Sequence, residues 1–107
     1  MSEFENRQKG QEKKFEMEQD LEFKAGARRN RLIGLWAAGL MGLTGDEAQA
    51  YAKSVVLADF EEAGDEDVLR KLRADLDAKA IAITDHQLRS RMAELLDEAR
   101  AQIRAGN

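Results

Sequence analysis

Residues 83–103 read ITDHQLRSRMAELLDEARAQI, and this stretch decides the fold class. Thr84 and Gln87 have the three-residue spacing of a capping box, in which each side chain bonds the other residue's backbone N–H at a helix start. Apolar residues then recur every three or four positions, as on one face of a helix. They are Leu88, Met92, Leu95, Leu96, Ala99 and Ile103. The stretch therefore predicts a helix over residues 85–105.

Working outward, the same period marks two more helices before this one. A third helix is expected from Asp65, with acidic residues in its first turn and an apolar stripe. That stripe is Val68, Leu69, Leu72 and Leu76. Thr44 and Glu47 repeat the capping-box spacing, and they predict a second helix over residues 44–63. This helix is apolar around most of its circumference, so we expect it to pack on more than one side.

The first helix of the expected body covers residues 20–41 and ends at Gly42, because glycine tolerates a left-handed cap. Its predicted stripe is interrupted only by Arg28. The stripe is Leu21, Ala25, Arg28, Leu32, Leu35, Gly39 and Leu43. Gly34 and Gly39, on either side of Trp36, are expected to mark close helix approaches. With no proline and no alternating segment, the pattern predicts an all-α fold: a four-helix antiparallel bundle, residues 20–107, behind a mobile N-terminal arm, residues 1–19.

Composition excludes several kinds of chemistry. The 107 residues suit one small domain, and the lack of cysteine excludes disulfides, thiolate metal sites and cysteine nucleophiles. The one histidine, His86, cannot build a histidine zinc site, and in a first helical turn with no nucleophile beside it we expect it to be exposed and without a catalytic role. We therefore expect no enzyme activity, no metal and no cofactor.

Charge and hydropathy limit the cellular locations and partners that we expect for the chain. The longest uncharged run, residues 32–45, has 14 residues, whereas a bilayer needs about 20. Residues 1–11 lack the apolar stretch of a secretory signal. A net charge of -4 gives no general attraction to nucleic acid or to an anionic membrane. We expect a soluble cytoplasmic protein, with no nucleic-acid partner and no direct membrane insertion.

The N-terminal arm, residues 1–19, is rich in charge and has few large apolar groups. Those groups are Met1, Phe4, Phe15 and Met17. Phe4 and Phe15 are 11 residues apart, nearly a whole number of turns, so they would share one face of a helix. Gly10 costs about 1 kcal/mol relative to alanine inside a helix, and alone the arm is not expected to be a stable one. Periodicity leaves two interpretations open: a disordered tail, or a motif that folds in a partner's groove.

Two charged clusters carry weaker hypotheses. Arg28, Arg29 and Arg31 form a basic run that could contact phosphates, but helical geometry spreads them by about 100° per residue, which favours one inward arginine and two solvated ones. Six carboxylates gather between the second and third helices. They are Asp59, Glu61, Glu62, Asp65, Glu66 and Asp67. They lack the ligand spacing of a calcium loop and predict a solvated corner, with Asp59 as a candidate partner of Arg28.

Two long stretches carry a resemblance to a known family. The sequence FKAGARRNRLIGLWAA at residues 23–38 and the sequence YAKSVVLADFEEAGDEDV at residues 51–68 resemble the zeta subunit family of alpha-proteobacterial ATP synthases. The resemblance runs from Phe4 to about Arg104. It implies a four-helix bundle that inhibits the F1 ATPase by inserting its mobile arm, which becomes helical, at a catalytic α/β interface.

On this resemblance, the inhibitory contacts lie in the arm. They are expected from Phe4, Arg7, Glu12, Lys14, Phe15 and Met17. The implied partners are the α and β subunits of F1, with γ as a further candidate, and the free protein is expected to be a monomer that lies peripheral to the inner membrane when bound. Gly10 and Gln11 depart from the family pattern, which has alanine and an aromatic residue there, and Gly26 stands in place of a glutamate. The alternative is a small ATP- or ADP-binding regulatory bundle that uses Arg28, Arg29 and Arg31.

Overall fold

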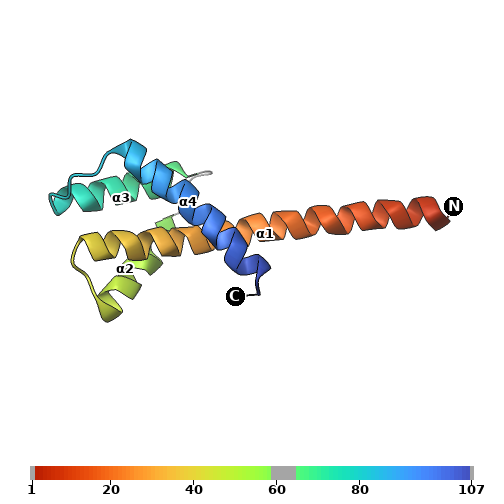
Figure 1. Ribbon diagram of the computed structural model, residues 1–107, viewed down its shortest axis with the longest axis horizontal. Helices are drawn as coiled ribbons and strands as arrows, with labels where there is room; N and C mark the ends of the chain where they lie inside the picture. Colours follow the sequence, from red (N-terminus) through yellow and green to blue (C-terminus); the bar gives the residue numbers. More distant parts are fainter. Residues whose placement is uncertain (1, 59–64, 107) are drawn as a thin grey trace.

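The computed structural model describes residues 2–58 and 65–106, with side chains from Gln19 onward. These residues form four helices and no strand, which confirms the all-α prediction. The helices are α1 (Ser2–Leu40), α2 (Gly45–Ala58), α3 (Glu66–Ala78) and α4 (Asp85–Arg104). Successive helices reverse direction, and α4 runs obliquely across α1 (Figure 1).

Helix α1 is much longer than the sequence predicts. It begins at Ser2 rather than near Asp20, so the backbone of the arm continues the body helix without a break. The prediction of a separate helix start at Asp20 is therefore wrong. No proline separates the two parts, and a helix that already exists extends without a new nucleus.

The second half of α1 lies at the centre of the body, where α2 and α4 pack against it. Its buried apolar residues are Ala25, Ile33, Ala37 and Ala38. The predicted stripe is shifted, because Arg28, Leu32 and Leu35 are only partly buried. A helix covered from two sides buries a wider face than one apolar stripe, and the buried polar residues Arg29 and Asn30 conceal that face in the sequence.

Gly34 marks the close approach between α1 and α2. A Cβ at this position would lie 2.7 Å from Ala52 Cα and 3.2 Å from Val55 Cγ2, so only glycine fits without a shift. Gly39 does not share this role, since a Cβ there would meet nothing within 4 Å. The prediction is confirmed for Gly34 and wrong for Gly39, which is exposed near the end of α1.

The hydrophobic core joins all four helices. It contains Ile33, Ala37, Val55, Val68, Leu69, Leu72, Leu76, Leu88 and Met92. The four residues predicted to form the stripe of the third helix are all buried. Helix α2 packs against both α1 and α3, which confirms the prediction that it packs on more than one side. Ala52 and Val55 are buried on it, whereas Leu57 is 56% exposed.

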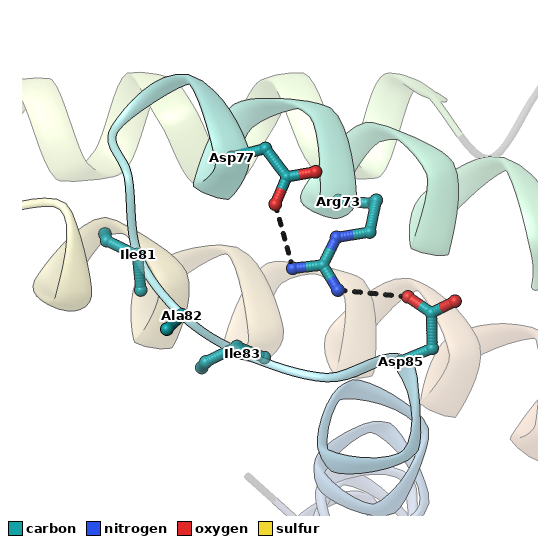
Figure 2. A pocket seen from close by; sticks show the side chains of 6 residues that line it. All are labelled: Arg73, Asp77, Ile81, Ala82, Ile83 and Asp85. Carbon is teal, nitrogen blue, oxygen red and sulfur yellow. Dashed lines mark hydrogen bonds and ion pairs between the residues drawn. The ribbon is translucent and has the colours of Figure 1, made fainter.

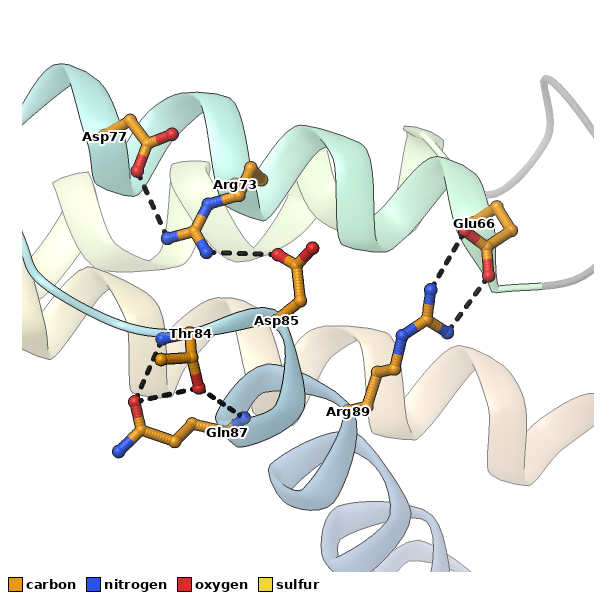
Figure 3. Close-up of polar contacts among 7 residues, drawn as sticks. All are labelled: Glu66, Arg73, Asp77, Thr84, Asp85, Gln87 and Arg89. Carbon is orange, nitrogen blue, oxygen red and sulfur yellow. Dashed lines mark hydrogen bonds and ion pairs between the residues drawn. The ribbon is translucent and has the colours of Figure 1, made fainter.

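Helix boundaries follow the capping signals. Thr84 Oγ1 accepts from the Gln87 backbone N–H at 3.1 Å, and Gln87 Oε1 accepts from the Thr84 N–H at 2.9 Å, which confirms the capping box (Figure 3). Gly42 has φ +79° after the end of α1, as its predicted role as a left-handed stop requires. The start of α2 directly after Thr44 is also confirmed, whereas its predicted end at residue 63 lies outside the described residues.

Polar contacts add specific ties between the helices. The Tyr51 hydroxyl on α2 donates to Asp75 Oδ2 on α3 at 2.8 Å. Burial and this hydrogen bond raise the pKa of Tyr51 well above its ordinary value. The Arg91 guanidinium on α4 lies 5.4 Å from the Trp36 ring centre on α1, within the range of a cation–π contact.

Candidate functional site

The arm is the part of α1 that leaves the body. Figure 1 shows the first half of this helix extending away from α2, α3 and α4. The molecule is 64 Å long but only 25 by 21 Å across. The six arm residues that are predicted to make the inhibitory contacts lie on this helical segment. They are Phe4, Arg7, Glu12, Lys14, Phe15 and Met17. The backbone of the arm thus projects from the body as a helix.

The arm joins the body at an ion pair between Glu22 and Arg100. Arg100 Nε donates to Glu22 Oε1 and Arg100 Nη2 donates to Glu22 Oε2, both at 2.8 Å. Asp97 Oδ1, one turn earlier on α4, accepts from Arg100 Nη1 at 3.2 Å. The hydrogen bonds from Arg100 lower the pKa of Glu22, and the positive charges of Arg100 and Arg104 act in the same direction. This bidentate contact ties α1 to α4 where the arm begins.

The three arginines of the nucleotide hypothesis do not gather at one site. Arg29 is 5% exposed and binds Asp65 Oδ1 at 2.7 Å, at the start of α3. Arg28 donates to Gln102 on α4 at 3.4 Å, and Arg31 donates to Gln49 on α2 at 3.0 Å. The inward arginine is therefore Arg29 and not Arg28, because α3 supplies its carboxylate there.

Arg29 also lines a pocket of about 200 Å³ between α1, α3 and α4. The second guanidinium of this pocket belongs to Arg89, which sequence reasoning did not single out. Glu66 accepts from Arg89 at 3.0 and 3.2 Å (Figure 3). Both cations of the pocket are thus paired with carboxylates of the α3 start.

The predicted acidic corner is partly visible. Asp59, Glu61 and Glu62 lie outside the described residues, so the pairing of Asp59 with Arg28 stays a prediction. Asp65 is the N-cap residue of α3, yet its side chain makes no cap hydrogen bond, because the carboxylate turns to Arg29. Asp67 is 5% exposed and accepts from Arg70 at 3.3 Å. Within the described ranges, no three His, Cys, Asp or Glu residues are grouped to hold a metal ion.

A second, open pocket lies at the far end of the body, between α3 and the loop before α4. Figure 2 shows Arg73 reaching from α3 between Asp77 and Asp85, with Ile81, Ala82 and Ile83 along the loop. Arg73 lies 3.1 Å from a carboxylate oxygen of each aspartate. This network fastens the loop to α3. His86, next in the chain, is exposed, as predicted.

Comparison with known proteins now decides the family. Residues 1–102 match the family described as ATPase inhibitor subunit zeta. The chain belongs to this family. The zeta subunits are inhibitors and not enzymes, which agrees with the expected lack of catalysis, and the family implies binding to F1-ATPase. No curated protein matches the chain.

The fold of this zeta-family chain is also found in a protein whose structure was determined in solution by NMR. The two sequences are 49% identical, and the match covers 81% of this chain and 99% of that one, with a TM-score of 0.72. Among the described helices, none is long and apolar enough to cross a membrane.

Sequence reasoning missed the contact between Glu22 and Arg100. The two residues are 78 positions apart, and each stands among other charged residues. Only the crossing of α4 over α1 brings them together, and helix periodicity does not encode where two helices cross. The prediction of the arm, by contrast, depends only on the composition of residues 1–19.

Proposed function

We propose that the protein inhibits ATP hydrolysis by F1-ATPase by inserting the arm, residues 1–19, at a catalytic α/β interface. The proposal rests on one observation: in a zeta-family chain, the first half of α1 extends beyond the four-helix body (Figure 1). A helical segment whose backbone extends away from the body is accessible to a partner. The body then acts as the holder of the arm.

The dimensions of the arm suit a wedge. At 1.5 Å per residue, 18 helical residues span about 27 Å, which is long enough to enter a cleft between subunits and obstruct its closure. Phe4 and Phe15 share one face of this helix and would supply the apolar anchors. Arg7, Glu12, Lys14 and Met17 are the further contact residues. The partners are the α and β subunits, with γ as a further contact, and no cofactor takes part.

Inhibition of hydrolysis also requires selectivity among enzyme states. The arm must bind one rotational state of F1 more tightly than the others, because equal binding to all states leaves their populations unchanged. Bound in this way, the protein would lie in the cytoplasm, peripheral to the inner membrane that carries the ATP synthase. The free protein is a monomer in this proposal, and residues from all four helices of the one chain form its core.

Deletion of residues 1–19 is the direct test. The truncated chain and the full chain are added to the cognate F1, and the rate of ATP hydrolysis is measured. We expect full-length protein to inhibit and the truncated chain to lose inhibition, while its cooperative thermal unfolding is retained. Unchanged inhibition by the truncated chain would refute the wedge mechanism. Capture of α and β subunits by tagged full-length protein tests the partners separately.

A further inference from the structure

The junction between the arm and the body is held by a defined contact. Both oxygens of Glu22 accept hydrogen bonds from Arg100, each at 2.8 Å, and Asp97 holds the third nitrogen of the same guanidinium. Two parallel N–H···O bonds fix the orientation of a carboxylate as well as its distance, which a single contact does not. The pair therefore limits rotation of α1 at this turn as well as its separation from α4.

The position of this contact along α1 is informative. Leu21 is partly buried and Ala25 is fully buried, whereas Gln19, Asp20, Phe23 and Lys24 are exposed. Among the described side chains, Glu22 thus lies in the first turn of α1 that the body touches. The neighbouring ion pair between Asp20 and Lys24 is confined to α1 and ties it to nothing else.

One turn further along the chain, Gly26 weakens the helix just behind this contact. A Cβ at Gly26 would meet nothing within 4 Å, so no close approach requires glycine there. Glycine inside a helix favours the unfolded backbone relative to alanine. Gly26 therefore weakens the body part of α1 one turn after Glu22, and the Glu22–Arg100 pair stands on the arm side of this glycine.

We propose that Glu22 and Arg100 form an arm clamp. The clamp keeps the first turn of α1 that the body touches helical, and the arm extends from this turn as a helix when it enters its cleft. Starting a new helix is costly, whereas adding residues to an existing one is not. The clamp also fixes the direction in which the arm leaves the body, which raises its effective concentration at a cleft beside the docked body. Glu22 is a positioning residue in this proposal, which rests on the proposed function.

The chain contains a matched control pair. Arg89 and Glu66 also form a two-bond contact between helices, at 3.0 and 3.2 Å, but they join α4 to the start of α3 (Figure 3). The two glutamates are similarly exposed, with 53% for the side chain of Glu22 and 59% for that of Glu66. Replacing either by glutamine removes one charge and keeps the shape. Only Glu22→Gln changes the arm junction.

The test measures amide hydrogen exchange in full-length protein and inhibition of the cognate F1. We expect Glu22→Gln to raise exchange rates about threefold at residues 18–26, with the amides of α3 and α4 unchanged, and to slow the onset of inhibition by a similar factor. Glu66→Gln should change neither quantity. Adding Gly26→Ala to Glu22→Gln should return both the exchange rates at residues 18–26 and the onset of inhibition most of the way to those of the unchanged protein. Alanine favours the same helical turn without touching Arg100.

Two results would overturn the clamp. One is an exchange pattern in Glu22→Gln that matches the unchanged protein at residues 18–26, and the other is an equal loss of inhibition in Glu66→Gln. The exchange measurement needs no F1, so it tests the clamp even if the arm proves not to inhibit. Failure of the wedge mechanism itself shows separately, as inhibition that survives deletion of residues 1–19.

Discussion

The two halves of α1 share one backbone helix but differ in what surrounds them. From Ala25 to Ala38, buried residues lie against α2 and α4, and the helix is part of the core. Before Gln19 the same helix extends away from the body (Figure 1). Burial of apolar surface, more than intrinsic propensity, stabilises most helices in proteins. The contrast separates a half that belongs to the core from a half that extends beyond the body, which we propose to be the inhibitory part.

The charges of the two halves support the same division. In the body half, Arg29 is buried and paired with Asp65, so its charge is satisfied within the chain. In the arm, Gly10 and the repelling pair Lys9 and Lys13 oppose helix formation in isolation. In the proposed mechanism, this segment is stabilised as a helix by the surface of the partner. The comparison therefore predicts that changes in one half alter stability and changes in the other alter inhibition.

The largest expected effect separates the two halves directly. Ile33 is fully buried in the core, and Ile33→Ala should lower the free energy of unfolding by about 2–5 kcal/mol, measured by urea unfolding followed by circular dichroism. Phe15→Ala should leave that free energy within about 0.5 kcal/mol while weakening inhibition of F1. A loss of stability in Phe15→Ala as large as that in Ile33→Ala would mean that the arm packs on the body.

The next effect concerns two glycines of the body half. Gly34→Ala would place a methyl group 2.7 Å from Ala52 Cα, which forces α1 and α2 apart and should lower the free energy of unfolding by about 1–3 kcal/mol. Gly39→Ala, in the same helix but in open space, should be neutral or raise it by up to about 1 kcal/mol. Thermal unfolding of both variants checks this. If both variants prove neutral or more stable than the unchanged protein, helix propensity, and not the close approach, decides the effect.

The sequence was sufficient to predict what depends on local patterns. The box of Thr84 and Gln87 is set by residues three positions apart, and the stripe of α3 follows one simple period, so both could be predicted. Gly42 as the stop of α1 is local in the same way. Capping and amphipathic burial are encoded in short stretches, and they determine helix number and order.

Features that depend on helix packing could not be predicted. The choice of Arg29 over Arg28 as the inward arginine depends on where Asp65 lies at the start of α3. The clamp of Glu22 and Arg100 depends in the same way on the crossing of α4 over α1. Such contacts join residues far apart in the chain, and any of several charged neighbours would fit the sequence equally well. Three-dimensional packing selects one partner.

A smaller effect is expected at the start of α4. Thr84→Ala removes the acceptor of the Gln87 backbone N–H and should lower the free energy of unfolding by about 1 kcal/mol, because that donor loses its partner. Thr84→Ser keeps a hydroxyl acceptor and should retain most of the stability. Chemical unfolding of the two variants makes the comparison. A deficit of the same size in Thr84→Ser would assign the effect to the lost methyl group instead of the cap.

The smallest expected effect is the pH dependence of the clamp. Arg100 lowers the pKa of Glu22 below its ordinary value of 4.5 in the folded protein, so the unfolded chain takes up this proton first as the pH falls. The contribution of Glu22 to stability is therefore fully present above pH 4.5 and is lost as the pH falls through the lowered pKa. Glu22→Gln has no such proton to take up, so its melting temperature should differ from that of the unchanged protein above this range and approach it below. Glu66→Gln is the control for acid effects elsewhere. A difference between Glu22→Gln and the unchanged protein that stays constant throughout the acid titration would show that ionisation of Glu22 does not stabilise the contact with Arg100.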